Sequence, residues 1–241
     1  MKYVIFSDIH GNLEAFESVL ADAARENPDR YFCAGDIIGY GANPVECLRK
    51  TKTLGAVTVC GNHEWAVLDM TLLEYFADYA RQAVEWTSTK LSARKKDYIK
   101  SLQLTYADDE MAMVHGTWMR PEKFDYVFDF QIASQMLKAI PAKVCFIGHS
   151  HVSGVFCGKN GSLEYSAGPK ITVEKDKGYL VNVGSVGQPR DGDWRASYCI
   201  WDKEKGTIEI KRVKYDIEKA KDKIRKAGLP ASLAARLGEG R

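Results

Sequence analysis

The chain has 241 residues, of which 45% are hydrophobic and 27% charged, and its 34 basic and 32 acidic residues leave a formal net charge of +2. This composition is ordinary for a soluble globular enzyme. The even charge argues against an obligate nucleic-acid binder, whose phosphate contacts require concentrated Lys and Arg. We also find no apolar run long enough for a signal peptide or a membrane span, so no membrane partner is expected.

The first part of the chain alternates strand-like and helix-like segments. Residues 3–8 (YVIFSD) and 30–36 (RYFCAGD) read as strands on either side of a helix-like stretch from Leu13 to Arg25. After a Gly/Pro loop, residues 56–64 (AVTVCGNHE) give a third strand. This βαβ rhythm predicts an α/β domain with parallel strands.

Residues 65–103 read as helical throughout and are expected to form a rim or cap over a site. One face follows i, i+3, i+4 spacing, with Leu72, Tyr75, Phe76, Tyr79, Ala83 and Trp86. We interpret this stripe as a packing surface, with a partial role over a ligand as the alternative. The basic run KLSARKK (90–96) is interpreted as a solvated helix face.

The second half of the chain is mostly β. Strands are predicted in MAMVHG (111–116) and KVCFIGHS (143–150), then in short segments with turns between about 152 and 213, where GKNG (158–161) signals a hairpin. The C-terminal tail, residues 213–241, is predicted to hold a basic helix with a solvated charged face, a turn at GLP (228–230) and a second short helix. Because no Pro/Gly/Ser-rich linker separates the halves, residues 1–241 are expected to form a single domain.

The cysteines indicate a reducing compartment. Six are present without C-x-x-C spacing, and most lie in apolar, strand-like runs. Buried reduced thiols are the expected state, and a cytoplasmic location follows.

The apolar runs of the α/β part end in side chains typical of metal ligands. These are Asp8, His10, Asp36, Asn62, His63, His115, His149 and His151, which include all five histidines of the chain. Ligands of open α/β sheets bind outside the carboxyl ends of the strands, so we expect these residues to gather on one rim. In extended backbone, the i, i+2 pairs Asp8/His10 and His149/His151 would each point toward one spot.

The residue types predict the kind of metal. His, Asp and Asn without thiolate favour Mn, Fe, Co or Zn in a catalytic setting, not a closed structural zinc site. Setting His63 aside, seven candidate ligands exceed what one ion with an open position needs, and they fit two ions bridged by a shared carboxylate. Two divalent ions less two carboxylates and a bridging hydroxide leave a positive pocket, which suits an anionic ester.

Five segments in this order resemble the calcineurin-like metallophosphoesterase superfamily: DIH (8–10), GDIIG (35–39), GNHE (61–64), HG (115–116) and GHSH (148–151). The resemblance implies a four-layer αββα sandwich. It further implies that one metal is held by Asp8, His10, Asp36 and His151, and the other by Asp36, Asn62, His115 and His149. His63, facing away from Asn62 at an extended strand end, would protonate the leaving group or steady the phosphate, and Glu64 would orient its neighbours.

The implied activity is hydrolysis of phosphomono- or phosphodiesters of small molecules or nucleotides by attack of a metal-bridging hydroxide on phosphorus. Asp36 and His63 would be catalytic, and Asn62 would also meet the substrate. Protein Ser/Thr phosphatases of the superfamily carry an arginine where this chain has Tyr40, which argues against that activity. Arg190 is the candidate phosphate contact, with a surface salt bridge as its alternative, and Arg120 is a second candidate.

Other functions are weighed against this one. A dinucleoside polyphosphate (Ap4A-type) hydrolase is the main alternative. The size of the pocket over the metals would distinguish it from a phosphomonoesterase or a phosphodiesterase. A non-catalytic scaffold predicts missing ligands, yet every motif residue is present. A nucleic-acid enzyme is supported by the KLSARKK run alone.

Overall fold

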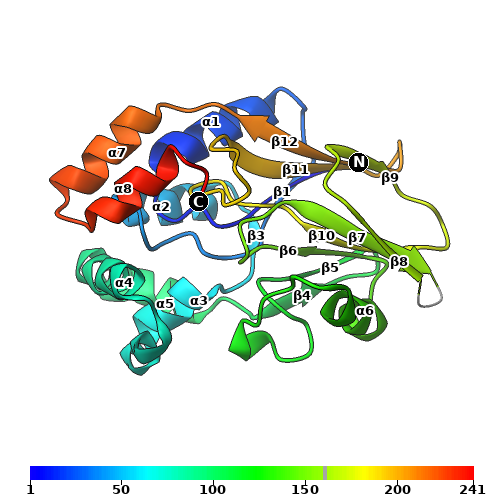
Figure 1. Ribbon diagram of the computed structural model, residues 1–241, viewed down its shortest axis with the longest axis horizontal. Helices are drawn as coiled ribbons and strands as arrows, with labels where there is room; N and C mark the ends of the chain where they lie inside the picture. The colour runs from blue at the N-terminus through cyan, green and yellow to red at the C-terminus, as the bar shows by residue number, and fades with distance from the viewer. Residues whose placement is uncertain (160–161) are drawn as a thin grey trace.

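In the computed structural model, which describes residues 1–159 and 162–241, two six-stranded mixed sheets pack face to face between helices (Figure 1). The first sheet, in the order β3-β2-β1-β11-β12-β9, contains β1 (Lys2–Phe6), β2 (Arg30–Cys33), β3 (Val57–Thr58), β9 (Lys170–Thr172), β11 (Ala196–Asp202) and β12 (Thr207–Val213). The second, in the order β4-β5-β6-β10-β7-β8, contains β4 (Thr105–Ala107), β5 (Met111–Val114), β6 (Val144–Ile147), β7 (Gly154–Lys159), β8 (Ser162–Ser166) and β10 (Gly178–Asn182). β1, β2 and β3 pair in parallel, as do β5, β6 and β10, and the remaining pairs are antiparallel.

Side-chain alternation along the strands produces the layers. In β1, Ile5 packs into the core between the two sheets, whereas Phe6 packs against the helices. In β6, Phe146 faces the same inter-sheet core and Ile147 faces the other way. Successive residues of a strand point to opposite faces, so fully apolar strands of this kind must be covered on both sides. The four-layer αββα sandwich is confirmed.

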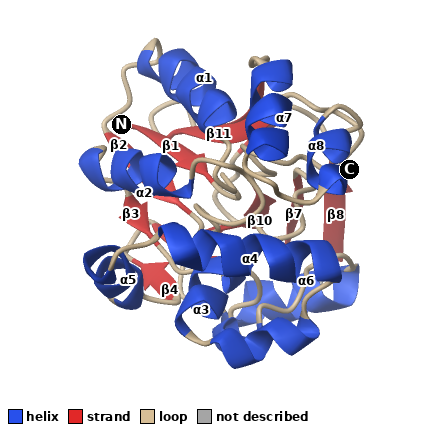
Figure 2. Ribbon diagram, turned by 90° about the vertical axis from the view of Figure 1, so that its left-hand side faces the viewer, coloured by secondary structure: helices blue, strands red, loops and turns tan. Residues whose placement is uncertain are grey.

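Helices cover both outer faces (Figure 2). On the first sheet lie α1 (Leu13–Ala24), α2 (Pro44–Thr53), α7 (Ile217–Lys226) and α8 (Ala231–Leu237), and on the second lies α6 (Phe130–Ala139). The sequence analysis missed α2 and α6, as well as β4 and β9. Pro44 at the first turn of α2 was an available start signal, whereas strands of three residues are too short for periodicity to reveal.

The prediction that residues 65–103 are helical throughout is wrong. The segment begins with α3 (Asn62–Leu68) and continues as the 3-10 helix η1 (Met70–Tyr75), α4 (Asp78–Lys90) and α5 (Ala93–Lys100). Its breaks have local causes: the Asp69 side chain caps η1 through the N–H of Thr71, and Phe76 and Leu91 adopt extended backbone. The aromatic stripe therefore splits, so that Ala83 and Trp86 pack in the core while its first part lines a cleft.

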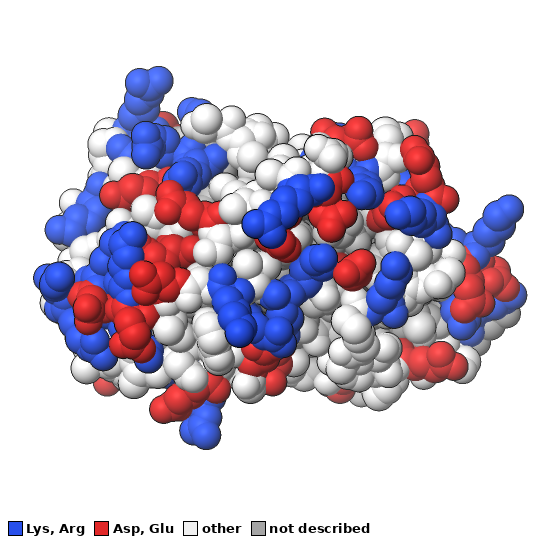
Figure 3. Space-filling model, turned by 90° about the horizontal axis from the view of Figure 1, so that it is seen from above, with Lys and Arg blue, Asp and Glu red and all other residues white. Residues whose placement is uncertain are grey.

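The tail forms two helices, as predicted. On α7, exposed Arg225 pairs with Asp222 along the helix, and the upper face of the molecule intersperses basic and acidic side chains (Figure 3). Lys223 departs from the expected solvated face, because its Nζ lies 2.6 Å from a carboxylate oxygen of buried Glu14. β7 and β8 pair antiparallel as the hairpin signal predicts, although residues 160–161 of GKNG lie outside the described part.

The six cysteines are free thiols, and all except half-buried Cys157 are buried. Across residues 1–159 and 162–241, no helix combines the length and the apolarity needed to cross a bilayer.

Candidate metal centre

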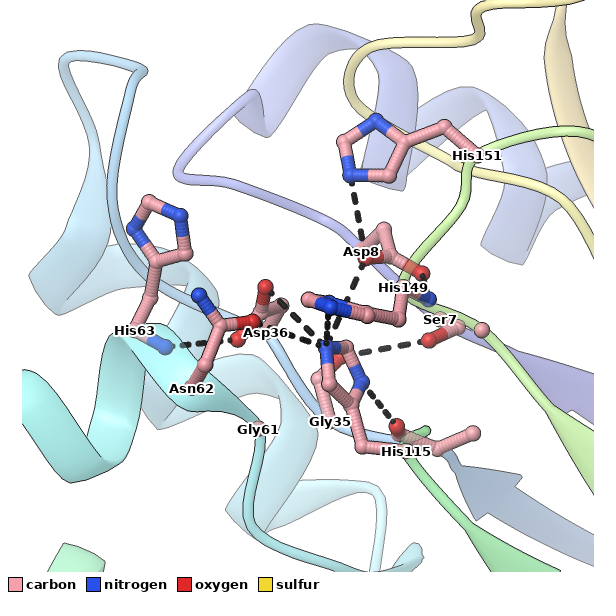
Figure 4. A network of polar contacts seen from close by, with 12 residues as sticks. Ser7, Asp8, Gly35, Asp36, Gly61, Asn62, His63, His115, His149 and His151 are labelled. Atoms are coloured by element: carbon pink, nitrogen blue, oxygen red, sulfur yellow. Dashed lines mark hydrogen bonds and ion pairs between the residues drawn. The ribbon is translucent and has the colours of Figure 1, made fainter. Parts of the chain in front are cut away.

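The predicted ligands converge at the carboxyl ends of strands from both sheets (Figure 4). Asp8 and Asp36 follow β1 and β2 in the first sheet, while His115 and His149 follow β5 and β6 in the second. We predicted that residues at the strand ends gather on one rim. This prediction is confirmed for the acidic residues and histidines of the motifs. The site thus lies at the carboxyl ends of interior strands of both sheets.

The backbone of these loops differs from the sequence-based expectation. Asp8 (φ 53°), His10 (φ 47°), Asp36 (φ 52°), His149 (φ 67°) and His151 (φ 60°) all adopt left-handed conformations. The argument from extended i, i+2 geometry is therefore wrong, although the side chains still converge. Left-handed backbone is uncommon for residues other than glycine and costs of order 1–3 kcal/mol per residue. The surrounding fold supplies that energy, and such strain typically concentrates at functional sites.

Glu64 organises one of these loops. Its buried carboxylate accepts hydrogen bonds from the backbone N–H groups of Asp36 (2.8 Å), Ile37 (2.8 Å), Ile38 (3.1 Å) and Gly61 (3.1 Å). Burial, reinforced by the charge of Asp36, raises the pKa of Glu64 to about 7. This arrangement matches the orienting role that the resemblance implies.

Asn62 and His63 open helix α3 and do not end an extended strand. The expectation that they face opposite ways is therefore corrected, because successive helical residues are about 100° apart. The N–H of His63 donates to Asp36 Oδ1 at 2.9 Å. The start of α3 thereby holds the Asp36 carboxylate from one side.

Two groups of ligand atoms form around Asp8 and Asp36, and a third combination, His10, Asp36 and His63, overlaps both. In the first, His151 Nε2 lies 3.1 Å from Asp8 Oδ1 and 3.0 Å from His10 Nε2. In the second, His115 Nε2 lies 3.2 Å from Asp36 Oδ2 and 3.1 Å from His149 Nδ1.

Asp36 links the two groups, and Asn62 joins the second. Asp36 Oδ2 lies 3.6 Å from His10 Nε2 as well as 3.2 Å from His115 Nε2. Asn62 Oδ1 lies 3.2 Å from His115 Nε2. Asp36 therefore lies within reach of ligand atoms of both groups.

Hydrogen bonds outside the two groups fix the orientation of three imidazoles. The Nδ1 atoms of His10, His115 and His151 face the carbonyl oxygens of Ile38 (3.1 Å), Ala34 (2.7 Å) and Gln188 (2.5 Å). Since a carbonyl only accepts, each Nδ1 carries a proton, and in the neutral imidazole each Nε2 then presents a lone pair to the centre.

This donor set fits metal ions. Two such lone pairs meet at 3.0 Å between His10 and His151, and buried Asp8 Oδ1 has no hydrogen-bond partner among the described residues. Both arrangements are unfavourable unless a metal ion or an additional proton lies between the atoms. Burial also lowers the pKa of His149 to about 3 and of His151 to about 4, which keeps them in the neutral form that binds metal. Against the effect of burial, the charge of Asp36 raises the pKa of His115 to about 9, so His115 would release a proton when it binds a metal ion.

A cleft of about 710 Å³ opens over the centre, and Asn62, His63, His149 and Arg190 line it. His63 is 2% exposed, and its Nδ1 has no hydrogen-bond partner among the described residues. Its atoms also lie within 4.8 Å of ligand atoms of His10 and Asp36. His63 therefore lies between the metal ligands and the cleft.

The two candidate arginines are placed differently. Arg190 donates through Nη2 to the hydroxyl of Tyr40 (3.3 Å) and to Gln188 Oε1 (3.1 Å), so its partners in the described part of the chain are neutral. Arg120 is exposed, pairs with Asp125 at 2.8 Å, and is not among the residues that line the cleft. The fold brings Arg190 to the site and leaves Arg120 outside it.

The sequence analysis missed one wall of the cleft. Tyr126 stacks on His149 with ring centroids 4.0 Å apart, and Phe124 lines the cleft beside it. A signal was available, because Trp118, Phe124, Tyr126, Phe128 and Phe130 lie within the 14 residues that follow the HG motif. Of these five, Phe124 and Tyr126 line the cleft.

Comparisons with known proteins agree with this geometry. A sequence profile described as the calcineurin-like phosphoesterase superfamily domain matches residues 1–206. An uncharacterized protein of Methanocaldococcus jannaschii is 40% identical over 241 residues, which cover 98% of this chain and 97% of that protein. The crystal structure of a metallophosphoesterase from Sphaerobacter thermophilus has a TM-score of 0.89 and 36% identity, covering 100% of this chain and 99% of that one. A symmetrical bis(5′-nucleosyl)-tetraphosphatase of Psychromonas ingrahamii is 35% identical over 71 residues, only 28% of this chain and 26% of that protein.

Proposed function

The chain belongs to the calcineurin-like phosphoesterase superfamily, and from this premise we propose that it is a hydrolase of phosphomono- or phosphodiesters of small molecules or nucleotides that uses two transition-metal ions. The observation that carries the proposal is the pair of ligand groups with Asp36 near both. Mn, Fe, Zn and Co are the candidate metals for this donor set.

The ligand assignment follows the two groups. One ion would be held by Asp8, His10, Asp36 and His151, and the other by Asp36, Asn62, His115 and His149, as the contacts around each group support. When bound, such ions polarise phosphoryl oxygens and lower the pKa of a water molecule to near neutrality. The fixed Nδ1–H hydrogen bonds hold three of the histidines ready for this task.

Two further side chains act on the substrate. His63 would hydrogen-bond to a phosphoryl oxygen or protonate the leaving group, because it lies at the base of the cleft beside the ligands. Arg190 would bind the phosphoryl group, because no carboxylate in the described chain holds it and its Nε has no hydrogen-bond partner there. Tyr40, 8% exposed, fills the place of the arginine found in protein phosphatases and accepts a hydrogen bond from Arg190.

Hydrolysis of dinucleoside polyphosphates is the second candidate. The short match to a symmetrical bis(5′-nucleosyl)-tetraphosphatase supports it, as does a cleft large enough to hold much more than a phosphate group.

The test is hydrolysis by metal-stripped protein resupplied with Mn²⁺. The substrates are 4-nitrophenyl phosphate, bis(4-nitrophenyl) phosphate and diadenosine tetraphosphate, and Asp36→Asn is the blank. Turnover that disappears in the blank supports the proposal, and the preferred substrate separates monoesterase, diesterase and dinucleotide hydrolase. Absence of turnover on all three, with two metals bound per chain, would refute the proposal for these classes of ester and favour a non-catalytic scaffold.

A further inference from the structure

The cleft over the metal centre has two walls that come from distant parts of the chain. One wall is the η1–α4 segment, with Tyr75, Phe76 and Tyr79, and the other is the loop around η2 (Pro121–Lys123), with Phe124 and Tyr126. Figure 1 shows the first wall in cyan and teal beside α3 and the second in green. The 710 Å³ between them is within the roughly 300–1,000 Å³ of small-molecule sites, so the cleft has room for a leaving group.

The first wall presents its aromatic side chains from an anchored base. Leu73 is 5% exposed and packs in the core, which fixes η1, while Tyr75 on the same turn is 80% exposed. Phe76 meets His63 edge-on, with centroids 5.3 Å and planes 73° apart. The guanidinium of Arg236 on α8 lies over the Tyr79 ring, 4.9 Å from its centroid.

The second wall is held in an unfavourable conformation. Phe124 has φ 51°, which is a genuine outlier for a bulky side chain. The loop passes directly over Gly116, where an added Cβ would lie 2.8 Å from the carbonyl oxygen of Asp125. Strain of this kind persists only where surrounding contacts over-determine it, and it marks ligand-binding segments.

The rings of both walls are available to a ligand. Within the described residues, Phe76 and Phe124 make only edge-on contacts with other rings, at interplanar angles of 69–73°. Among the described residues, neither ring is stacked face to face on another aromatic ring, and both side chains are only half-buried where they line the cleft. Glu122, Lys123 and Tyr75 add polar groups to the lining of the same cleft.

We propose that the cleft binds the base of a nucleoside between Phe76 and Phe124, so that the preferred substrates are phosphoesters of nucleosides. This inference rests on the proposed function for its catalytic consequence, because the base would belong to the group esterified to the reacting phosphate. Aromatic side chains stack on any nucleobase, since every base has a π-face. An aliphatic phosphoester would leave both ring faces without a partner.

Adenosine monophosphate and ribose 5-phosphate are the matched test substrates, because they share the ester and differ in the base. Stacking of one base predicts a kcat/KM about 5- to 150-fold higher for adenosine monophosphate. Phe76→Leu and Phe124→Leu should each reduce this ratio several-fold, while Phe130→Leu, an exposed phenylalanine outside the cleft, should leave the ratio unchanged. Equal kcat/KM values for the two substrates in the wild type would overturn the inference, as would variants that keep the full ratio.

Calorimetric binding of adenosine, compared with ribose, separates this inference from the proposed function, because neither compound carries a phosphate to hydrolyse. Adenosine binding that weakens in Phe76→Leu and Phe124→Leu supports the stacking site even if no ester is hydrolysed. Hydrolysis of 4-nitrophenyl phosphate without adenosine binding would refute the stacking site and leave the phosphoesterase standing. A higher kcat/KM for benzyl phosphate than for adenosine monophosphate would refute the nucleoside in favour of a small aryl group.

Discussion

Replacing His63 by alanine separates its proposed catalytic role from metal binding. Only the imidazole is lost, because the hydrogen bond to Asp36 comes from the His63 backbone N–H at 2.9 Å and remains. The imidazole Nδ1 has no partner among the described residues, so no hydrogen bond of that atom is broken. The structural cost is therefore packing against Tyr40, His10 and Phe76, whose ring centroids lie 4.5–5.3 Å away.

These contacts set the expected magnitudes. Loss of packing around one buried ring should cost about 1–3 kcal/mol of unfolding free energy, which lowers Tm by roughly 2–12 °C in a chain of this size. Loss of a positioned acid or phosphate donor should lower kcat about 10²- to 10⁴-fold, or about 2.7–5.5 kcal/mol of transition-state stabilisation. The variant should therefore remain folded at 25 °C with two metals bound and little activity.

The assay combines metal analysis with two leaving groups. Metal content per chain is measured on Mn²⁺-loaded wild type, His63→Ala and Asn62→Ala, the last as a control expected to lose metal. kcat is then compared for a 4-nitrophenyl ester and an alkyl ester of phosphate. A loss confined to the alkyl ester identifies His63 as the proton donor, and an equal loss on both identifies it as a phosphate contact. Loss of a metal ion from His63→Ala, or unchanged kcat on both esters, would refute the assignment.

Three further predictions address the loops, the surface and the metals. Glu64→Gln should lower Tm and weaken metal retention about 10- to 100-fold at pH 8. The reason is that the amide NH₂ would face two of the four backbone N–H donors that now surround the carboxylate. A variant with the Tm and metal retention of wild type would show that these hydrogen bonds do not position Asp36. The pKa of Glu26 is lowered from 4.5, chiefly by its hydrogen bond from Lys2. Ionised Glu26 therefore stabilises the fold above about pH 4.5, by less than about 1 kcal/mol for a pair near the surface, and this contribution is lost as pH falls through the folded-state pKa. The Tm of Glu26→Gln should equal that of wild type below the folded-state pKa of Glu26 and be slightly lower than wild type at neutral pH, and a difference independent of pH would contradict this. Chelation should lower Tm, and re-addition of Mn²⁺ should restore it. At a free metal concentration 100 times Kd, one bound ion raises the free energy of unfolding by about 2.7 kcal/mol. A Tm that responds to neither step would exclude specific binding to the folded chain.

The sequence alone determined the fold class and the identity of the converging residues. Apolar runs that end in Asp8, Asp36 or His115 are local patterns, and the carboxyl ends of parallel strands must share one edge of a sheet. The motif residues therefore came together as predicted even though the backbone geometry assumed for them was wrong. That assumption failed because the left-handed conformations of His149 and His151 are imposed by contacts with other loops, such as the N–H of His149 donating to Asp8 Oδ2 at 3.0 Å.

Tertiary structure decided whatever depends on residues far apart in the chain. The Nε2 atoms of three histidines face the centre because carbonyls of other loops, such as Gln188 O for His151, bind their Nδ1 atoms. Arg190 reaches the site while Arg120 does not, although both follow candidate ligands in sequence. The cleft itself forms between Phe76 and Phe124, 48 positions apart by their numbers, because tertiary packing brings the η1–α4 segment and the η2 loop to the same site, and no local periodicity records that arrangement.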